Sequence, residues 1–329
     1  MGRWRLSYGY LVIVLVLSVG CDGGGGGGGG DGATDTGTGW DLTCIDELGD
    51  PDADPGTDPD AGVDPGDVPV EVPADTTVEG DAPWDADGDG PVDEVWHPAP
   101  GTSWQWQLSD YPVDTGLDVV MYDVDLFDTP QATIDALHDD GRIVVCYFSA
   151  GSREDWRDDA DLFPPEAVGN DLDGWPGESW LDVRHAGVRS VMEARLDLAA
   201  SKGCDGVEPD NVDGYTNDPG FPLVYDDQLD YNLFLAAEAH ERGLSVGLKN
   251  DLDQVDDLVD HFDWALNEEC FEWEECEMLL PFIAAGKAVF HVEYGGEGLA
   301  ETVCPYANGL DFDTLVKNWD LDAWRVACR

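Results

Sequence analysis

Two carboxylates stand at the ends of two short apolar segments in this chain. Asp210 ends one of them and Glu268 ends the other. In the first segment, the alternation of side chains puts Glu208 and Asp210 on one face, and Pro209 indicates that regular strand pairing ends there. Cleavage of a glycosidic bond needs two such carboxyl groups, one to protonate the leaving oxygen and one to attack or to activate water. We therefore take Asp210 and Glu268 as the candidate catalytic pair.

Other polar side chains also finish or follow apolar segments. They are Asp123, Asp125, Tyr147, Ser149, Glu154, Asn211, Lys249, Asn250, Asn267, Glu269, Glu293 and Tyr294. A surface or capping role is the simpler interpretation of any single one, but such groups at six segment ends favour a shared site. The glycine-rich loops of phosphate-binding proteins and the nucleophile elbow of serine hydrolases are missing from the sequence. Ser149 therefore has no support as a nucleophile.

Eight short apolar segments predict the strands that would position these residues. They are residues 104–107, 119–124, 143–148, 180–183, 206–208, 244–248, 264–266 and 288–292. Between them, apolar residues recur at helical spacing in 188–199 and 229–237, and Gly203 and Gly243 end these helices. The alternation predicts an α/β fold, a (β/α)8 TIM-type barrel whose functional face is the carboxyl ends of its strands. The first two predicted strands leave room only for a turn between them. The apolar stretch 324–328 could be a barrel strand in place of one of the eight.

Six motifs along the chain carry a family resemblance. They are Val145-Cys-Tyr-Phe-Ser-Ala-Gly-Ser-Arg-Glu-Asp-Trp156, Gly174-Trp-Pro-Gly177 with Trp180-Leu-Asp-Val-Arg184, Asp205-Gly-Val-Glu-Pro-Asp-Asn-Val-Asp-Gly214, Gly247-Leu-Lys-Asn-Asp251, Ala265-Leu-Asn-Glu-Glu-Cys270 and Phe290-His-Val-Glu-Tyr294. Together they resemble glycoside hydrolase family 114, the endo-α-1,4-polygalactosaminidases, over residues 104–328.

The resemblance implies an endo-acting barrel enzyme that cleaves α-1,4-linked galactosamine or N-acetylgalactosamine polysaccharides with retention of configuration. It implies that Asp210 is the nucleophile, which should stay ionised to attack. It implies that Glu268 is the general acid and base, which should hold a proton to donate, although Glu269 stands beside it as an alternative.

The resemblance also implies which residues bind the sugar. They are Tyr147, Glu154, Glu208, Asn211, Lys249, Asn250, Asn267, Glu293 and Tyr294. Among these, Glu208 and Glu293 would hold the sugar or tune the catalytic pair. Trp104, Trp106 and Trp175 are candidates for stacking on sugars, with packing in the core or at the rim as the alternative for each.

The first residues predict an export signal. Arg3 and Arg5 precede an apolar run over residues 11–17, which is too short to span a membrane as a mature helix. The run leads to a Ser-Val-Gly-Cys sequence that resembles a bacterial lipobox and predicts lipidation of Cys21 and anchoring in a membrane. Ser18 stands where leucine is usual, so secretion without a lipid is the alternative. Both alternatives put the mature protein outside the cytosol.

An acidic, glycine-rich segment follows the signal. From Asp22 to Glu94 there are 22 Asp and Glu and no Lys or Arg, a composition that predicts a disordered tether. Asp85, Asp87 and Asp89 imitate the start of a calcium loop, but Trp96 stands where the loop needs a bidentate Glu, so we interpret the segment as linker. The chain thus divides into a signal peptide (1–21), a disordered linker (22–95) and a glycoside hydrolase domain (96–329).

The charge of the domain restricts its partners. After residue 94 there are 50 Asp and Glu against 13 Lys and Arg, which makes nucleic acid an implausible partner. We expect a cationic amino-sugar polysaccharide as substrate, because its ammonium groups are attracted to an acidic surface. We expect a monomer that uses no metal ion and no cofactor.

Cysteines in an exported chain predict disulfides. Cys270 and Cys276 are six residues apart and form the best local pair, and Cys304 with Cys328 is the next. Cys146 lies within an apolar strand, where a buried free thiol is the expectation.

Two other function classes compete with the enzyme. One is a catalytically silent surface protein that binds polysaccharide in the same cleft. The other is a calcium-dependent structural module, which rests only on the aspartates of the tether. The pair of Asp210 and Glu268 favours the enzyme, because a binding protein does not need paired carboxylates.

Overall fold

The computed structural model describes residues 95–329. The predicted signal segment, the predicted lipidation site Cys21 and the tether up to residue 94 lie outside the described residues. Within the described part of the chain, no helix combines the length and the apolar character that crossing a membrane requires.

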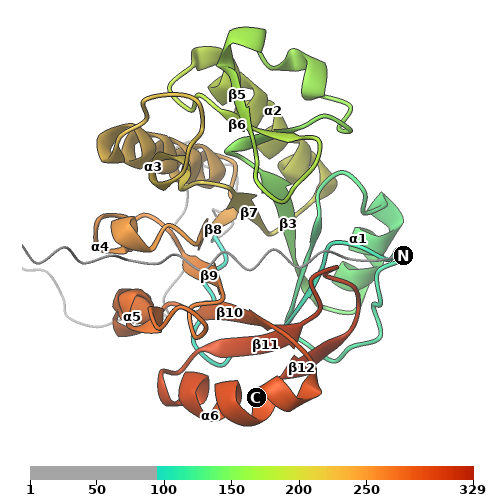
Figure 1. The fold of residues 1–329 in the computed structure, drawn as a ribbon. Helices are drawn as coiled ribbons and strands as arrows, with labels where there is room; N and C mark the ends of the chain where they lie inside the picture. The colour runs from blue at the N-terminus through green and yellow to red at the C-terminus, as the bar shows by residue number, and fades with distance from the viewer. Residues whose placement is uncertain (1–94) are drawn as a thin grey trace, which may run out of the picture. The chain divides into compact units, whose positions relative to one another are not determined.

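Eight parallel strands form a barrel-like sheet (Figure 1). In chain order they are β1 (Trp104–Gln107), β2 (Met121–Asp125), β3 (Ile143–Ser149), β7 (Gly206–Asp210), β8 (Ser245–Lys249), β9 (Trp264–Glu268), β10 (Val289–Tyr294) and β11 (Asp313–Lys317). Each pairs in parallel with the next in this order. Their carboxyl ends therefore meet at one end of the barrel, which confirms the predicted TIM-type fold.

A short antiparallel strand lies at the seam between the first and last parallel strands. This strand, β12 (Arg325–Ala327), pairs with β11. Side chains bridge the seam to β1, because Trp104 Nε1 donates to the backbone oxygen of Asp313 over 2.8 Å and Gln105 Nε2 donates to that of Ala323 over 2.9 Å. The apolar stretch 324–328 therefore supplies an edge strand and replaces none of the parallel ones.

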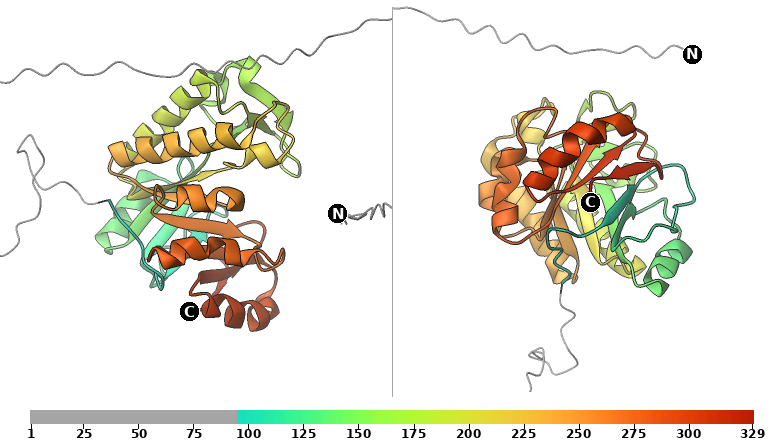
Figure 2. Two further views of the ribbon diagram at one scale, coloured as in Figure 1. Left: turned by 90° about the vertical axis from the view of Figure 1, so that its left-hand side faces the viewer. Right: turned by 90° about the horizontal axis from the view of Figure 1, so that it is seen from below.

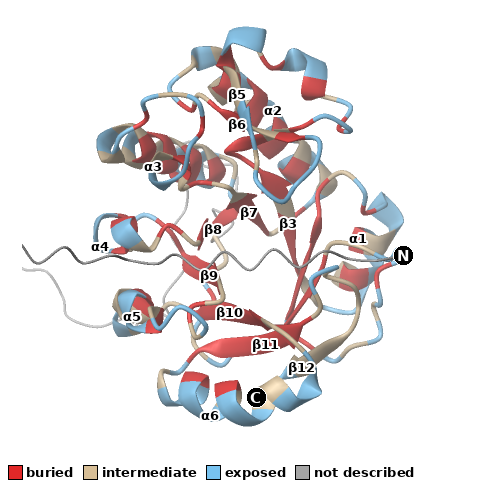
Figure 3. Ribbon diagram, in the orientation of Figure 1, coloured by how far each residue is buried: buried red, intermediate tan, exposed pale blue. Residues whose placement is uncertain are grey.

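Helices lie outside the ring of strands (Figure 2). They are α1 (Gln131–Asp139), α2 (Ala186–Lys202), α3 (Tyr225–Glu241), α4 (Val255–Leu258), α5 (Leu280–Ala284) and α6 (Ala300–Gly309). The predicted apolar spacing of α2 buries Val188, Met192 and Leu196 in the core. Gly203 ends this helix with a left-handed φ of 78°, a conformation that glycine adopts without a steric penalty. Figure 3 shows that the buried residues follow the strands and the inner faces of the helices.

The predicted fourth barrel strand is wrong. Glu178–Leu181 form β6, which pairs antiparallel with β4 (Ser152–Glu154) and β5 (Val168–Asp171) in a separate small sheet. The eighth parallel strand is instead β11, with the sequence Asp-Thr-Leu-Val-Lys. All five of its residues are buried, and its two charged ends are satisfied because Asp313 accepts from Arg329 and Lys317 donates to a backbone oxygen. Because this strand is polar at both ends, the apolar pattern of the sequence did not predict it.

Three disulfides link cysteines of the described residues. They are Cys146–Cys204, Cys270–Cys276 and Cys304–Cys328. The last two are the predicted pairs, but the expectation of a free thiol at Cys146 is wrong. Cys204 lies just before β7, the strand that pairs with β3, so strand pairing brings the two Cα atoms to 6.0 Å. His291 lies near enough to Cys270 and Cys276 to complete a group of metal ligands, but the disulfide occupies both sulfur atoms.

Candidate active site

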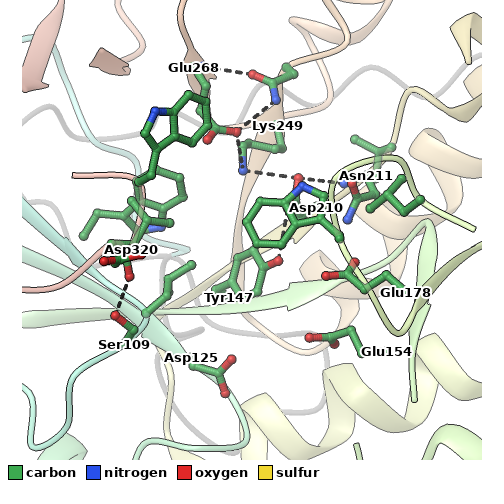
Figure 4. Close-up of a pocket in the computed structure, with 18 of the residues that line it drawn as sticks. Ser109, Asp125, Tyr147, Glu154, Glu178, Asp210, Asn211, Lys249, Glu268 and Asp320 are labelled. Carbon is green, nitrogen blue, oxygen red and sulfur yellow. Dashed lines mark hydrogen bonds and ion pairs between the residues drawn. The ribbon is translucent and has the colours of Figure 1, made fainter. Parts of the chain in front are cut away.

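A cleft of about 1060 Å³ opens at the carboxyl ends of the barrel strands (Figure 4). Its lining includes Asp210 at the end of β7, Lys249 at the end of β8 and Glu268 at the end of β9. The small antiparallel sheet contributes Glu154 and Glu178. These residues meet although they are far apart in the sequence, because parallel strands finish at the same end of a barrel.

Lys249 lies among three carboxylates at the centre of the site. Its side chain is 2% exposed, and its Nζ lies 2.9 Å from Oε1 of Glu208, 3.2 Å from Oδ1 of Asp210 and 3.1 Å from Oε2 of Glu268. Burial acts to lower the pKa of Lys249, but the three carboxylates outweigh burial and raise this pKa well above its ordinary value. Lys249 is therefore a permanent positive charge in an acidic site.

Backbone geometry fixes Asp210 at the end of β7. Asn211 has a left-handed φ of 61°, which asparagine tolerates better than most residues, and its amide donates to Oδ1 of Asp210 over 2.7 Å. The hydroxyl of Tyr147 donates to Oδ2 over 3.1 Å. Gly151 approaches Asn211 so closely that a Cβ atom there would lie 1.6 Å from the Asn211 carbonyl oxygen. The turn after β3 therefore needs glycine to support the nucleophile candidate.

Glu268 is held in a similar way at the end of β9. Asn250 contacts it twice, since its Nδ2 donates to Oε2 over 3.2 Å and its Oδ1 accepts from the Glu268 amide over 2.9 Å. The hydroxyl of Tyr294 donates to Oε1. Glu269 follows with a left-handed φ of 63°, and strained residues of this kind cluster at functional sites. The side chains of Asp210 and Glu268 are 18% and 24% exposed, so both reach the cleft.

A second acidic layer lies inside the barrel next to Lys249. Glu208 is fully buried, and its Oε2 accepts from Trp106 Nε1 over 3.0 Å. Burial raises the pKa of Glu208 to about 7 against the opposing effect of Lys249. Burial and the neighbouring Glu208 raise the pKa of Asp123 well above its ordinary value. A protonated Asp123 can donate to Glu208, which gives a partner to one of the two buried Asp123 oxygens that otherwise have none.

Six of the nine predicted sugar-binding residues line the cleft. They are Tyr147, Glu154, Asn211, Lys249, Asn250 and Tyr294. Glu208, Asn267 and Glu293 are buried and lie behind this lining, and their predicted part in sugar binding stays a prediction. Asn267 accepts from the Cys270 amide over 3.2 Å, and Glu293 accepts from the Phe271 amide over 2.8 Å. These two side chains position the loop that follows β9.

Some of the aromatic residues pack in the core, and others line the cleft. Trp104 and Trp106 are 1% exposed and pack inside the barrel, which was the predicted alternative to stacking on sugars, although Trp106 reaches the floor of the cleft. Trp175 is 52% exposed and lines the cleft. Trp319 also lines it, 59% exposed and stacked on Tyr294 with ring centroids 3.9 Å apart. Sequence reasoning missed Trp319 because it follows β11, the strand that the apolar pattern did not reveal.

The whole described domain matches a known protein family. The family model for glycoside-hydrolase family GH114 matches residues 91–329. The chain belongs to family GH114. It is therefore a glycosidase, and the predicted resemblance is confirmed.

Solved structures agree with this GH114 assignment. The crystal structure of Aspergillus fumigatus Ega3 in complex with galactosamine is 43% identical in sequence, covers 71% of this chain and 98% of its own, and has a TM-score of 0.69. The glycoside hydrolase domain of PelA from Pseudomonas aeruginosa is 13% identical, with 68% and 98% coverage and a TM-score of 0.56, so it shares the fold. No curated protein matches the sequence.

Proposed function

We propose that this GH114 enzyme cleaves α-1,4-linked galactosamine polymers at internal bonds with retention of configuration. The observation that carries the proposal is the bridge that Lys249 makes between Asp210 and Glu268. One oxygen of each carboxylate lies within 3.2 Å of Nζ, so these two oxygens are at most twice that distance apart. This supports the separation of about 5–5.5 Å found in retaining glycosidases over the 6.5–9.5 Å of inverting ones.

The sugar class is supported by similarity. Ega3 was solved with galactosamine and is 43% identical to this chain. The acidic lining of the cleft suits an ammonium-bearing sugar, because opposite charges across a binding surface favour association and orientation.

In the first step, Asp210 attacks the anomeric carbon while Glu268 gives its proton to the glycosidic oxygen. The bond between that carbon and oxygen breaks, and a glycosyl ester forms on Asp210. Burial and the charge of Asp210 raise the pKa of Tyr147 well above its ordinary value. The Tyr147 hydroxyl therefore stays neutral and continues to donate to the nucleophile.

In the second step, Glu268 acts as a carboxylate. It takes a proton from water, whose oxygen attacks the anomeric carbon and displaces Asp210. Lys249, Asn250 and Tyr294 stabilise this ionised form of Glu268.

Cleavage at internal bonds needs binding on both sides of the catalytic pair. Trp175 belongs to the small sheet region, where its carbonyl oxygen accepts from the Glu178 amide. Trp319 stacks on Tyr294, which donates to Glu268. One exposed indole thus accompanies each side of the cleft, and each can stack on a sugar ring.

We also propose that the enzyme acts outside the cytosol, at the cell surface. The signal sequence exports the chain, Cys21 carries a lipid anchor, and the acidic tether lets the domain reach a surface polymer. The three disulfides support an oxidising environment. A monomer suffices, because one chain supplies all of the catalytic groups named above.

Product analysis tests this function. The purified protein is incubated with α-1,4-galactosamine polymers of differing acetylation, products are sized by mass spectrometry, and the first anomer formed is observed by proton NMR. We expect a ladder of oligosaccharides whose new ends are initially α. Initial β ends would indicate inversion, and polymer binding without new reducing ends would favour a silent polysaccharide-binding protein.

A further inference from the structure

Asp123 is a buried acid in the interior of the barrel. It lies two residues after Met121, whose side chain belongs to the apolar cluster inside the barrel, so the alternation of the strand directs Asp123 inward as well. The side chain is 0% exposed and lies outside the cleft lining. Within residues 95–329, neither of its oxygens has a hydrogen-bond partner. An ionised carboxylate without a partner is costly to bury, so Asp123 is stable in this position only when it carries a proton.

Glu208 is the group that can accept a hydrogen bond from this proton. Trp106 lies beside Asp123 in the parallel register of β1 and β2, and its Nε1 donates to Oε2 of Glu208 over 3.0 Å. Oε1 of Glu208 lies 2.9 Å from Nζ of Lys249, so each oxygen of Glu208 has a lone pair left for a second donor. Burial raises the pKa of Asp123 well above its ordinary value, and the charge of Glu208 adds to this effect. Burial also raises the pKa of Glu208 to about 7, but Lys249 and the hydrogen bond with Asp123 oppose it. The proton therefore resides on Asp123.

Lys249 connects this buried pair to the catalytic groups. Its Nζ contacts Glu208, Asp210 and Glu268 at once, and Figure 4 shows it between Asp210 and Glu268. In the first step proposed above, Asp210 loses its negative charge to the ester and Glu268 gains one, so the total charge beside Lys249 stays constant. This balance requires that Glu208 keeps its own charge through both steps.

The other titratable groups around the pair do not compete for this proton. Burial raises the pKa values of Tyr147 and Tyr294 well above their ordinary range, so both hydroxyls stay neutral. Asp125, two residues after Asp123 on the same strand, lies 2.6 Å from Arg157 and is neutralised there. The charge of Glu208 therefore depends on where Asp123 and Glu208 hold their proton.

We propose that Asp123 is a positioning residue that shares one proton with Glu208 and thereby keeps Glu208 ionised beside Lys249 throughout the reaction. This role rests on the proposed function, because Asp123 acts on the reacting groups only through Glu208 and Lys249. A proton on Asp123 gives a partner to one of its own buried oxygens and a further donor to Glu208. Without that donor, the buried Glu208 takes up a proton itself, and Lys249 then favours the ionised form of Glu268 more strongly.

Two substitutions separate the proton of Asp123 from the shape of its side chain. Asp123→Asn can still donate to Glu208, whereas Asp123→Leu keeps the branching of the side chain and cannot donate. The pH profile of kcat/KM on an α-1,4-galactosamine polymer has an alkaline limb that reports loss of the proton on Glu268. We expect this limb to stay in place in Asp123→Asn and to move down by about one pH unit in Asp123→Leu. Asp313→Asn is the matched control, because Asp313 is 3% exposed but begins β11 at the opposite end of the barrel, and it should leave the limb in place.

Two results of these profiles would overturn the proposal. Equal shifts in Asp123→Asn and Asp123→Leu would show that Asp123 is ionised in the wild-type protein. An unchanged limb in a folded Asp123→Leu variant would show that Asp123 does not act on Glu208.

Infrared spectroscopy detects the proton without hydrolysis. A protonated carboxyl group and a carboxylate absorb at different C=O stretching frequencies, so the difference spectrum between the wild-type protein and Asp123→Asn isolates Asp123. At about pH 8, far above the ordinary pKa of aspartate, we expect the variant to lose a band of a protonated carboxyl group. Loss of a carboxylate band instead would contradict the shared proton. A protein that shows the expected band but cleaves no polymer would refute the proposed function and leave the shared proton in place.

Discussion

The Nζ atom of Lys249 lies 2.9 Å from Oε1 of Glu208, and both side chains are buried next to the two carboxylates that we propose as catalytic. Because Lys249 also contacts Asp210 and Glu268, this ion pair joins the barrel interior to the cleft. Breaking a buried pair by removing one partner leaves an uncompensated charge, which costs more than the pair contributes.

Lys249→Met is therefore expected to abolish hydrolysis and to lower the free energy of unfolding by about 3–5 kcal/mol. Adding Glu208→Gln should recover part of that stability, because it removes the buried acid that the first substitution leaves unpaired. Activity should stay lost, because Asp210 and Glu268 still lack their shared cation. Urea unfolding of both single variants and the double variant measures the coupling. Strictly additive losses would show that the two residues do not stabilise each other.

Trp319→Ala is expected to raise KM on a long polymer about 3- to 10-fold, the loss expected for one aromatic stacking contact. Stability should not change, because Trp319 is 59% exposed. Trp273→Ala is the control, since Trp273 is 65% exposed and lies outside the cleft lining. Steady-state kinetics of both variants check this prediction, and similar effects of the two substitutions would exclude a specific stacking role for Trp319.

Asp251 gives the folded protein a defined pH dependence. It is 4% exposed, and burial, followed by the charge of Asp213, raises its pKa to about 8 from the ordinary value of 3.8. Since the folded pKa exceeds the unfolded one, folding carries a penalty that is full above pH 8, shrinks as the pH falls and is absent below about pH 3.8.

Asp251→Asn should remove this penalty. In the wild-type protein, Asn232 donates to Oδ2 of Asp251 over 2.8 Å, and the amide oxygen of the asparagine variant can still accept this hydrogen bond. Asparagine also suits the left-handed φ of 43° at this position. We expect the gain in unfolding free energy to be larger at about pH 8.5 than at about pH 5.5, by on the order of 2 kcal/mol. Urea unfolding at the two pH values measures the gain, and an identical gain at both would show that Asp251 does not titrate in this interval.

Two of the disulfides should differ in how much they contribute to stability and to activity. Cys146–Cys204 closes 58 residues and Cys270–Cys276 closes 6, so chain entropy predicts losses of about 4 and about 2 kcal/mol when each pair is replaced by alanine. The loop closed by Cys270–Cys276 starts directly after Glu268 and Glu269. Loss of this disulfide should therefore lower kcat more than loss of Cys146–Cys204. Unfolding by urea and steady-state kinetics of the two double variants test both statements. The reverse order of the two stability losses would contradict the entropic explanation.

Sequence reasoning found the barrel and the catalytic candidates because both follow repeating patterns. Seven of the parallel strands are apolar, and the residues that end them are polar, as at Asp210 and Glu268. It failed at β11, which is buried although polar, and at β6, whose apolar residues belong to a separate sheet. Glu178 was not among the predicted site residues. Only the antiparallel register of β6 with β4 brings it opposite Glu154 at the cleft.

We propose that Asp210 and Glu268 carry out the chemistry, and reducing-end release from an α-1,4-galactosamine polymer measures their contribution most directly. Asp210→Asn and Glu268→Gln keep the side-chain shape and remove the groups that attack and transfer the proton. We predict that each lowers the rate of release by at least about a thousandfold, while polymer binding and the melting temperature are retained. Release at the wild-type rate by either folded variant would contradict the mechanism.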